Sequence, residues 1–260
     1  MARLVALALP GGDAFVHELR KVWDAGDAVA VLDPAAPPRV RAAELDALRP
    51  SLVIDEAGAT ELADPLPLLD GDATVILTSG TSGRRRAAVH THAAIEAAAF
   101  ASAVTLGVDP DARWLACLPL HHVGGFGVVA RALVTGSALD VHPGFDAAAV
   151  MAAASAGCTH TSLVVTALRR IDPAAFRTIL LGGSAIPADR PANCVATYGM
   201  TESFGGVVYD GLAQPGVDVR VDDDGQILLR SPSLLRCYRE GEDPVRPDGW
   251  IPTGDLGRLD

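Results

Sequence analysis

Roughly the first 200 residues alternate between short apolar runs and stretches of helical length. Runs such as Leu4–Leu9, Ala28–Leu32 and Thr178–Leu181 have the length of buried strands, and helical stretches such as Asp13–Ala25 separate them. This alternation is typical of βαβ units, in which parallel strands lie beneath helices. The sequence therefore predicts an α/β fold with βαβ sheets flanked by helices.

The pattern changes after about Thr201, where short strand-like pieces stand between glycine, proline and aspartate turns. We expect strands at Val217–Val221, Gln226–Arg230 and Leu234–Tyr238. Residues 1–200 are accordingly expected to form α/β subdomains, and residues 201–260 a small distorted β-barrel subdomain of the same large domain.

Charge and cysteine content exclude several classes of protein. The chain has 260 residues and a formal net charge of −11, which argues against a nucleic-acid-binding protein because phosphate contacts dominate that affinity. The four cysteines are dispersed without a C-x-x-C pair, which argues against a zinc knuckle, a redox dithiol or a disulfide scaffold. No uncharged apolar run approaches the ~20 residues of a membrane helix. We expect a cytoplasmic enzyme without a membrane span. The sequence leaves the oligomeric state open, and a homo-oligomer is one alternative.

The strongest local signal is a loop of hydroxyl and glycine residues, Thr78-Ser79-Gly80-Thr81-Ser82-Gly83, directly after the apolar Val75–Leu77. Glycines allow the backbone to approach a polyphosphate closely, and hydroxyl groups donate hydrogen bonds to its oxygens. Arg84–Arg86 follow and offset charge. An ordinary surface turn explains the same residues equally well. A Walker P-loop is disfavoured because no Gly-Lys-Ser/Thr follows.

Three further segments carry groups suited to a nucleotide-dependent reaction. Thr197–Ser203 combines an aromatic ring with a carboxylate that can bind a hard cation, although a capped turn is the simpler explanation. Trp250–Gly257 places Asp255 in a glycine-flanked turn, where its carboxylate can accept bonds from sugar hydroxyls. His121 and His122 are adjacent, so on an extended chain they point to opposite sides, which argues against a shared metal ion; we expect one of them to face a cavity and the other to pack.

Taken together and in this order, these segments resemble the adenylate-forming superfamily of acyl-CoA synthetases, nonribosomal adenylation domains and luciferases. Thr78–Gly83 looks like its phosphate loop, and Thr197–Glu202 like its Tyr-Gly-x-Thr-Glu motif. Gly249–Gly257 and Leu181–Ser184 look like its later aspartate motif and its adenine-bordering glycine turn. Within the superfamily the chain is most similar to the o-succinylbenzoate–CoA ligases of actinobacteria, on segments that include Leu118–Gly125, the Arg-Ala-Leu at 131–133 and Val207–Gly211.

The resemblance implies an AMP-forming ligase of menaquinone biosynthesis that uses ATP, Mg²⁺ and coenzyme A. The carboxylate of a small-molecule substrate attacks the α-phosphate of ATP and releases pyrophosphate, and the thiol of coenzyme A then displaces AMP. The implied catalytic residues are His122 beside the reacting carboxylate, Thr201 at the α-phosphate and Glu202 as the Mg²⁺ ligand.

The remaining implied roles concern binding. ATP would be held by Thr78, Ser79, Gly80, Thr81, Ser82, Gly83, Arg86, Gly182, Gly183, Ser184, Tyr198 and Asp255. The acyl substrate would be held by His122, Thr197, Gly199 and Ser203, the last toward a second carboxylate.

The sequence departs from the family pattern at several points. Arg85 and Arg86 stand where the family loop has Pro and Lys, and Cys237-Tyr238 replaces its Gly-Tyr. The family continues past the equivalent of Asp260 with a C-terminal lid domain that carries a lysine, and Lys21 lies in the first helix. We therefore expect this chain alone to bind ligands but to adenylate slowly. Another acyl- or aryl-CoA ligase, an adenylation domain, and a non-catalytic nucleotide- or acyl-binding module stay open as alternatives.

Overall fold

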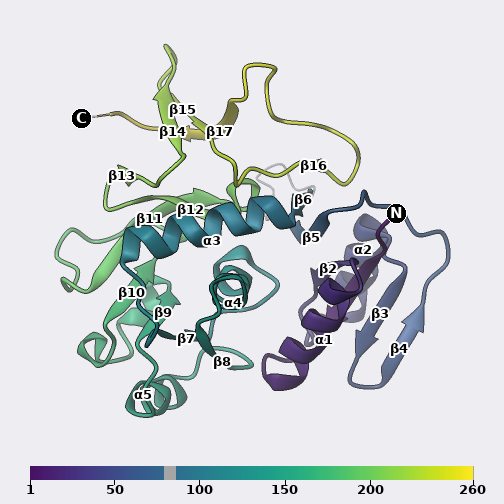
Figure 1. Ribbon diagram of the computed structural model, residues 1–260, viewed down its shortest axis with the longest axis horizontal. Coiled ribbons are helices and arrows are strands. Elements are labelled where there is room, and N and C mark those ends of the chain that lie inside the picture. Colours follow the sequence, from purple (N-terminus) through teal and green to yellow (C-terminus); the bar gives the residue numbers. More distant parts are fainter. Residues whose placement is uncertain (79–85, 260) are drawn as a thin grey trace.

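The computed structural model describes residues 1–78 and 86–259, which form two seven-stranded sheets and one three-stranded sheet (Figure 1). The first large sheet has the order β16-β6-β5-β2-β1-β3-β4. Its parallel strands are β1 (Leu4–Ala8), β2 (Ala28–Val31), β3 (Leu52–Asp55) and β5 (Asp72–Leu77). Its antiparallel strands are β4 (Gly58–Glu61), β6 (Ala87–Thr91) and β16 (Cys237–Tyr238).

The second large sheet has the order β13-β12-β11-β10-β9-β7-β8. Its parallel strands are β7 (Arg113–Ala116), β8 (Ala138–Val141), β9 (His160–Leu163), β10 (Thr178–Leu181) and β11 (Cys194–Met200). Two antiparallel strands, β12 (Gly205–Tyr209) and β13 (Leu212–Ala213), complete it. The predicted α/β fold with parallel βαβ sheets is confirmed.

The helices cover the sheets and fill the space between them. They are α1 (Asp13–Asp24), α2 (Pro38–Leu48), α3 (His92–Leu106), α4 (Val123–Thr135), α5 (Ala147–Ser155) and α6 (Val165–Leu168), with short 3₁₀ turns η1 (Pro173–Ala175) and η2 (Thr201–Ser203). The central apolar cluster joins residues of both large sheets to α1, α3 and α4, and Trp114 and Phe126 are almost fully buried in it. None of the helices in the described part of the chain has both the length and the apolar character of a membrane span.

Local sequence explains where the central helices begin and end. Thr91 caps α3 because its Oγ1 accepts a bond from the Ala94 backbone N–H at 3.1 Å. Gly107 and Gly136 end α3 and α4 with φ of 59° and 70°, a left-handed conformation that glycine adopts without steric cost.

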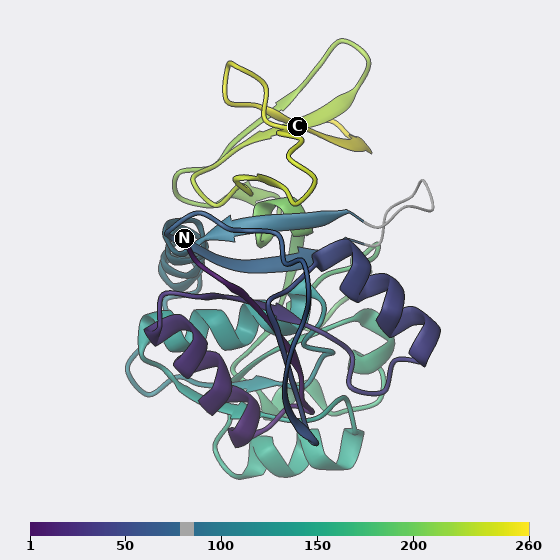
Figure 2. The ribbon, with the colours of Figure 1, turned by 90° about the vertical axis from the view of Figure 1, so that its right-hand side faces the viewer.

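The C-terminal 60 residues do not confirm the predicted barrel. Only β14 (Asp218–Val221), β15 (Gln226–Arg230) and β17 (Ile251–Leu256) form a separate antiparallel sheet, which stands above the two large sheets in Figure 2. The strand expected at Leu234–Tyr238 shrinks to β16, and β16 pairs with β6 of the first sheet. The last part of the chain therefore contributes strands to all three sheets.

Candidate functional site

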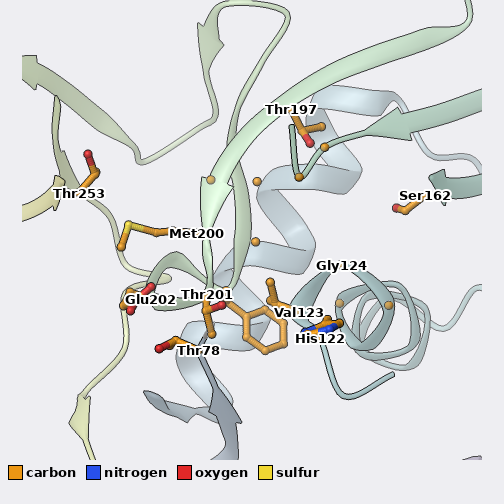
Figure 3. A pocket seen from close by; sticks show the side chains of 18 of the residues that line it. Thr78, His122, Val123, Gly124, Ser162, Thr197, Met200, Thr201, Glu202 and Thr253 are labelled. Atoms are coloured by element: carbon orange, nitrogen blue, oxygen red, sulfur yellow. The ribbon is translucent and has the colours of Figure 1, made fainter. Parts of the chain in front are cut away.

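A cavity of about 1200 Å³ lies where the two large sheets meet the three-stranded sheet (Figure 3). Its walls come from the end of β5, the ends of β9 to β11, the start of α4, the turn η2 and the segment 238–254. The carboxyl ends of parallel strands are where open α/β sheets bind ligands. The predicted site residues that line it are Thr78, Arg86, His122, Gly182, Gly183, Thr197, Gly199, Thr201 and Glu202.

The base of the predicted phosphate loop lies at this cavity. Ser79, Gly80, Thr81, Ser82 and Gly83 fall outside the described residues. The residues on either side of the loop are joined, since the Thr78 N–H donates to the Arg86 carbonyl at 2.7 Å. Thr78 is buried at the end of β5, and Arg86 precedes β6. The loop therefore starts and ends at the cavity wall.

The described lining residues do not include four of the predicted ones, Ser184, Tyr198, Ser203 and Asp255. Tyr198 and Asp255 nevertheless lie together, because the Tyr198 hydroxyl donates to Asp255 Oδ2 at 2.9 Å beside the cavity-lining Thr253. Burial raises the pKa of Tyr198 to about 12, and Asp255 adds to the increase. The phenol therefore stays a donor at neutral pH.

Ser203 is held inside its own turn. Its side chain is fully buried, and its hydroxyl donates to the Gly205 carbonyl at 2.8 Å and accepts from the Met200 N–H at 3.0 Å. These bonds fix η2, on which Thr201 and Glu202 stand. Ser203 therefore shapes the turn that carries Thr201 and Glu202, and its hydroxyl is engaged within that turn.

His122 is the histidine that faces the cavity. It precedes α4 as the N-cap residue, and its carbonyl accepts the Gly125 and Phe126 N–H groups at 3.0 and 2.9 Å. The described lining residues include His122 but not His121, although the two rings lie 4.3 Å apart between centroids. The turn into α4 thus directs the imidazole of His122 toward the ligand space.

Arg131 is a cavity-lining residue to which the sequence motifs assign no role. It lines the cavity from α4, and its guanidinium lies 4.8 Å above the Trp114 ring. Its Nε and Nη1 are buried, and their N–H groups donate to no acceptor among the described residues. Such donors normally bind something, because an unpaired buried polar group is costly. The signal was present in the sequence, since Arg131 carries the one charge in a 13-residue helix.

Glycines give the cavity its shape in two different ways. A Cβ on Gly199 would lie 1.9 Å from the Gly205 carbonyl oxygen, so glycine is what allows β11 and β12 to approach. Gly127 is different, because it lines the cavity inside α4 and nothing lies within 4 Å of an added Cβ. Inside a helix, glycine lowers stability by about 1 kcal/mol relative to alanine. At Gly127 the missing side chain leaves open space in the cavity.

The carboxylates of the site fit Mg²⁺ that arrives with a nucleotide. The described residues contain no group of three or more histidine, cysteine, aspartate or glutamate side chains able to hold a metal ion. Glu202 alone would contribute from η2, and Mg²⁺ is commonly bound by one or two carboxylates together with substrate phosphates and waters. The Glu202 carboxylate therefore fits a cation that is carried by a nucleotide.

The family model for AMP-binding enzymes matches residues 13–239. The chain belongs to the AMP-binding enzyme family. A probable 2-succinylbenzoate–CoA ligase of Mycobacterium tuberculosis is 37% identical over 216 residues, covering 74% of this chain and 55% of that protein. The 2-succinylbenzoate–CoA ligase of Bacillus licheniformis is 29% identical over 230 residues, covering 74% and 48%. The chain thus spans about half the length of these curated relatives.

Solved structures show the same fold as this AMP-binding family member. The o-succinylbenzoate CoA synthetase (MenE) from Bacillus subtilis, in complex with the acyl-adenylate intermediate OSB-AMP, superposes with a TM-score of 0.87 at 22% identity, covering 99% of this chain and 66% of that one. The N-terminal domain of FACL13 from Mycobacterium tuberculosis, bound to an inhibitor, gives 0.83 at 23% identity, covering 100% and 84%. The predicted large-domain fold of adenylate-forming enzymes is confirmed.

Proposed function

We propose that this chain carries the ATP- and acyl-binding site of an AMP-forming o-succinylbenzoate–CoA ligase of menaquinone biosynthesis. One observation supports this most strongly: Thr78, Thr201 and Glu202 line the same cavity as Arg131, whose buried Nε and Nη1 have no hydrogen-bond acceptor among the described residues. Two curated relatives are named as 2-succinylbenzoate–CoA ligases. A cytoplasmic location, where ATP and coenzyme A are available, is part of this proposal.

The proposed first step joins the substrate to the nucleotide. A carboxylate oxygen of the substrate attacks the α-phosphorus, and the bond to pyrophosphate breaks with the electron pair leaving on the pyrophosphate oxygen. Thr78 would donate to the β- and γ-phosphates, and Thr201 to the α-phosphate. Glu202 would hold Mg²⁺, which supplies charge neutralisation. Preorganised donors lower the barrier because they need no rearrangement as charge develops.

In this proposal the second carboxylate of the substrate would bind at Arg131, which lines the cavity from α4. o-Succinylbenzoate is an aromatic keto-acid with one carboxylate to activate and another on its ring. We infer that Arg131 accepts the second carboxylate, because a guanidinium binds a carboxylate with two parallel hydrogen bonds. His122 and Thr197 would lie beside the carboxylate that reacts.

A titration series tests the substrate class. Calorimetry with o-succinylbenzoate, benzoate and a medium-chain fatty acid, each with ATP and Mg²⁺, is expected to give tightest binding for o-succinylbenzoate. Equal or tighter binding of the fatty acid would overturn the assignment and favour another acyl-CoA ligase. Absence of nucleotide binding by the unmodified chain would overturn the nucleotide site as well.

An Arg131→Met variant tests binding of the ring carboxylate separately from binding of the carboxylate that reacts. The variant keeps an apolar stem against Trp114 and removes the guanidinium. We expect about 10- to 100-fold weaker binding of o-succinylbenzoate, because a hydrogen-bonded charge contributes about 1.5–3 kcal/mol. The affinity for ATP and for an analogue without the ring carboxylate should be unchanged, as measured by calorimetry. An equal loss for both acids would show that Arg131 acts on the shape of the cavity and not on the carboxylate.

Gly127→Leu should narrow the acyl end of the cavity. The added side chain enters space in which nothing lies within 4 Å of its Cβ, so the helix can accept it while ligand volume is lost. We expect weaker binding of o-succinylbenzoate, with ATP affinity retained and the thermal unfolding midpoint no lower than that of the parent. Unchanged binding of the aromatic acid would place the acyl group elsewhere.

A further inference from the structure

Tyr238 makes a direct contact with the proposed Mg²⁺ ligand. Its hydroxyl donates to Glu202 Oε1 at 2.8 Å, and both side chains are buried in the cavity wall. The two residues come from distant parts of the fold, Tyr238 from β16 of the first sheet and Glu202 from η2 beside the second. The bond therefore joins the two sides of the cavity.

The ring of the same tyrosine carries a second contact, to the proposed phosphate-binding cation. The guanidinium of Arg86 lies 4.2 Å from the centroid of the Tyr238 ring, and its terminal nitrogen also pairs with Glu242. A cation over an aromatic face is attracted by the negative potential of the ring. One side chain thus contacts both a cation and a carboxylate that face the ligand space.

The backbone around Tyr238 is anchored on both sides. Arg236 makes a bidentate pair with the buried Asp72, with both N···O distances 2.7 Å. Arg239 donates to backbone carbonyls of the first sheet's outer segments, for example to Leu48 at 2.8 Å. Because Arg236 and Arg239 fix the backbone near it, Tyr238 has a defined position from which its side chain can orient Glu202 and Arg86.

We propose that Tyr238 is a positioning residue for the metal–phosphate end of the site, a role that rests on the function proposed above. Its hydroxyl occupies Oε1 of Glu202 and leaves Oε2 to bind Mg²⁺, while its ring keeps Arg86 beside the phosphates. Tyr238 itself touches neither substrate nor metal in this role.

Two substitutions separate the hydroxyl from the ring. Tyr238→Phe removes the bond to Glu202 and keeps the surface on which Arg86 stacks. We expect its ATP affinity with Mg²⁺ to fall about tenfold, and its affinity in EDTA to equal that of the parent. Tyr238→Leu also removes the ring, so we expect its affinity to fall in EDTA as well. Calorimetry gives both affinities, and thermal unfolding verifies that each variant is folded.

Ser102→Ala is the matched control, since Ser102 is not among the described residues that line the cavity and the substitution removes a buried hydroxyl that bonds with Tyr209 at 3.1 Å rather than with Glu202. Both ATP affinities of this control should match those of the parent. If Tyr238→Phe shows the parent's response to Mg²⁺, the positioning role is wrong while the proposed function stands. If the parent itself binds no ATP, the proposed function is wrong, and the positioning role that rests on it is wrong as well.

Discussion

A Gly199→Ala variant is expected to lose stability and the ligand-binding site together. The added Cβ would lie 1.9 Å from the Gly205 carbonyl oxygen and 2.6 Å from the Gly206 Cα. Both are backbone atoms of the paired β12 region, so no side-chain rotation can relieve the overlap, and β11 and β12 must separate. We expect a loss of about 3 kcal/mol or more in the free energy of unfolding, measured by urea denaturation. Because Thr201 and Glu202 follow directly on β11, nucleotide affinity should fall with it.

Gly127→Ala is the control for this prediction. It adds the same methyl group in the same cavity wall, but nothing lies within 4 Å of it. Alanine is favoured over glycine inside a helix by about 1 kcal/mol, so the free energy of unfolding should rise slightly. An unchanged urea midpoint in Gly199→Ala would mean that the two strands do not lie as close as described here.

Arg239→Met is expected to be the most damaging change to the anchor that supports Tyr238. Arg239 is buried and donates to the carbonyls of Leu48, Arg49, Leu66 and Pro67 at 2.7–3.3 Å. Burial lowers the pKa of Arg239 to about 10, still far enough above neutral for the side chain to remain charged. Methionine fills similar volume but leaves these acceptors unpaired, at about 1–3 kcal/mol for each one that water cannot reach.

The expected total is a loss of about 3 kcal/mol or more in the free energy of unfolding, read from the urea midpoint at unchanged m-value. Arg230→Met provides the comparison. Arg230 bonds the exposed Asp218 at 2.8 Å, and about half of each side chain is exposed, so its loss should cost less than about 1 kcal/mol. Equal midpoints for the two variants would contradict the buried carbonyl contacts of Arg239.

The sequence predicts some strands of this chain and misses others. The apolar runs at β1, β2 and β10 are recognisable because a parallel strand buried on both faces is apolar throughout. The strand β6 was not predicted, since it follows three arginines and ends in the polar His90 and Thr91. Tertiary pairing with β5 and β16 makes it a strand, and no local pattern records that pairing.

The same limit applies to the candidate site. Thr201 and Glu202 could be named from a local motif, and they line the same cavity as Thr78. The Tyr238–Glu202 bond spans 36 residues and two sheets, so spacing could not predict it. Ser203 stands in the motif but bonds within its own turn, which only the backbone geometry shows. Local sequence therefore predicts the chemistry of single loops, while the fold decides which groups meet.

The strands contributed by the C-terminal 60 residues determine which sheet edges are open to pairing with other chains. The first large sheet ends at one edge in β16, and the second ends at one edge in β13. Each of these edge strands is only two residues long. An exposed, long edge strand offers unpaired N–H and C=O groups to other chains, and very short edge strands limit that hazard. Removal of residues 201–260 would uncover the longer β6 and β11 as new edges. The shortened chain should therefore aggregate through edge-to-edge pairing rather than persist as a folded monomer.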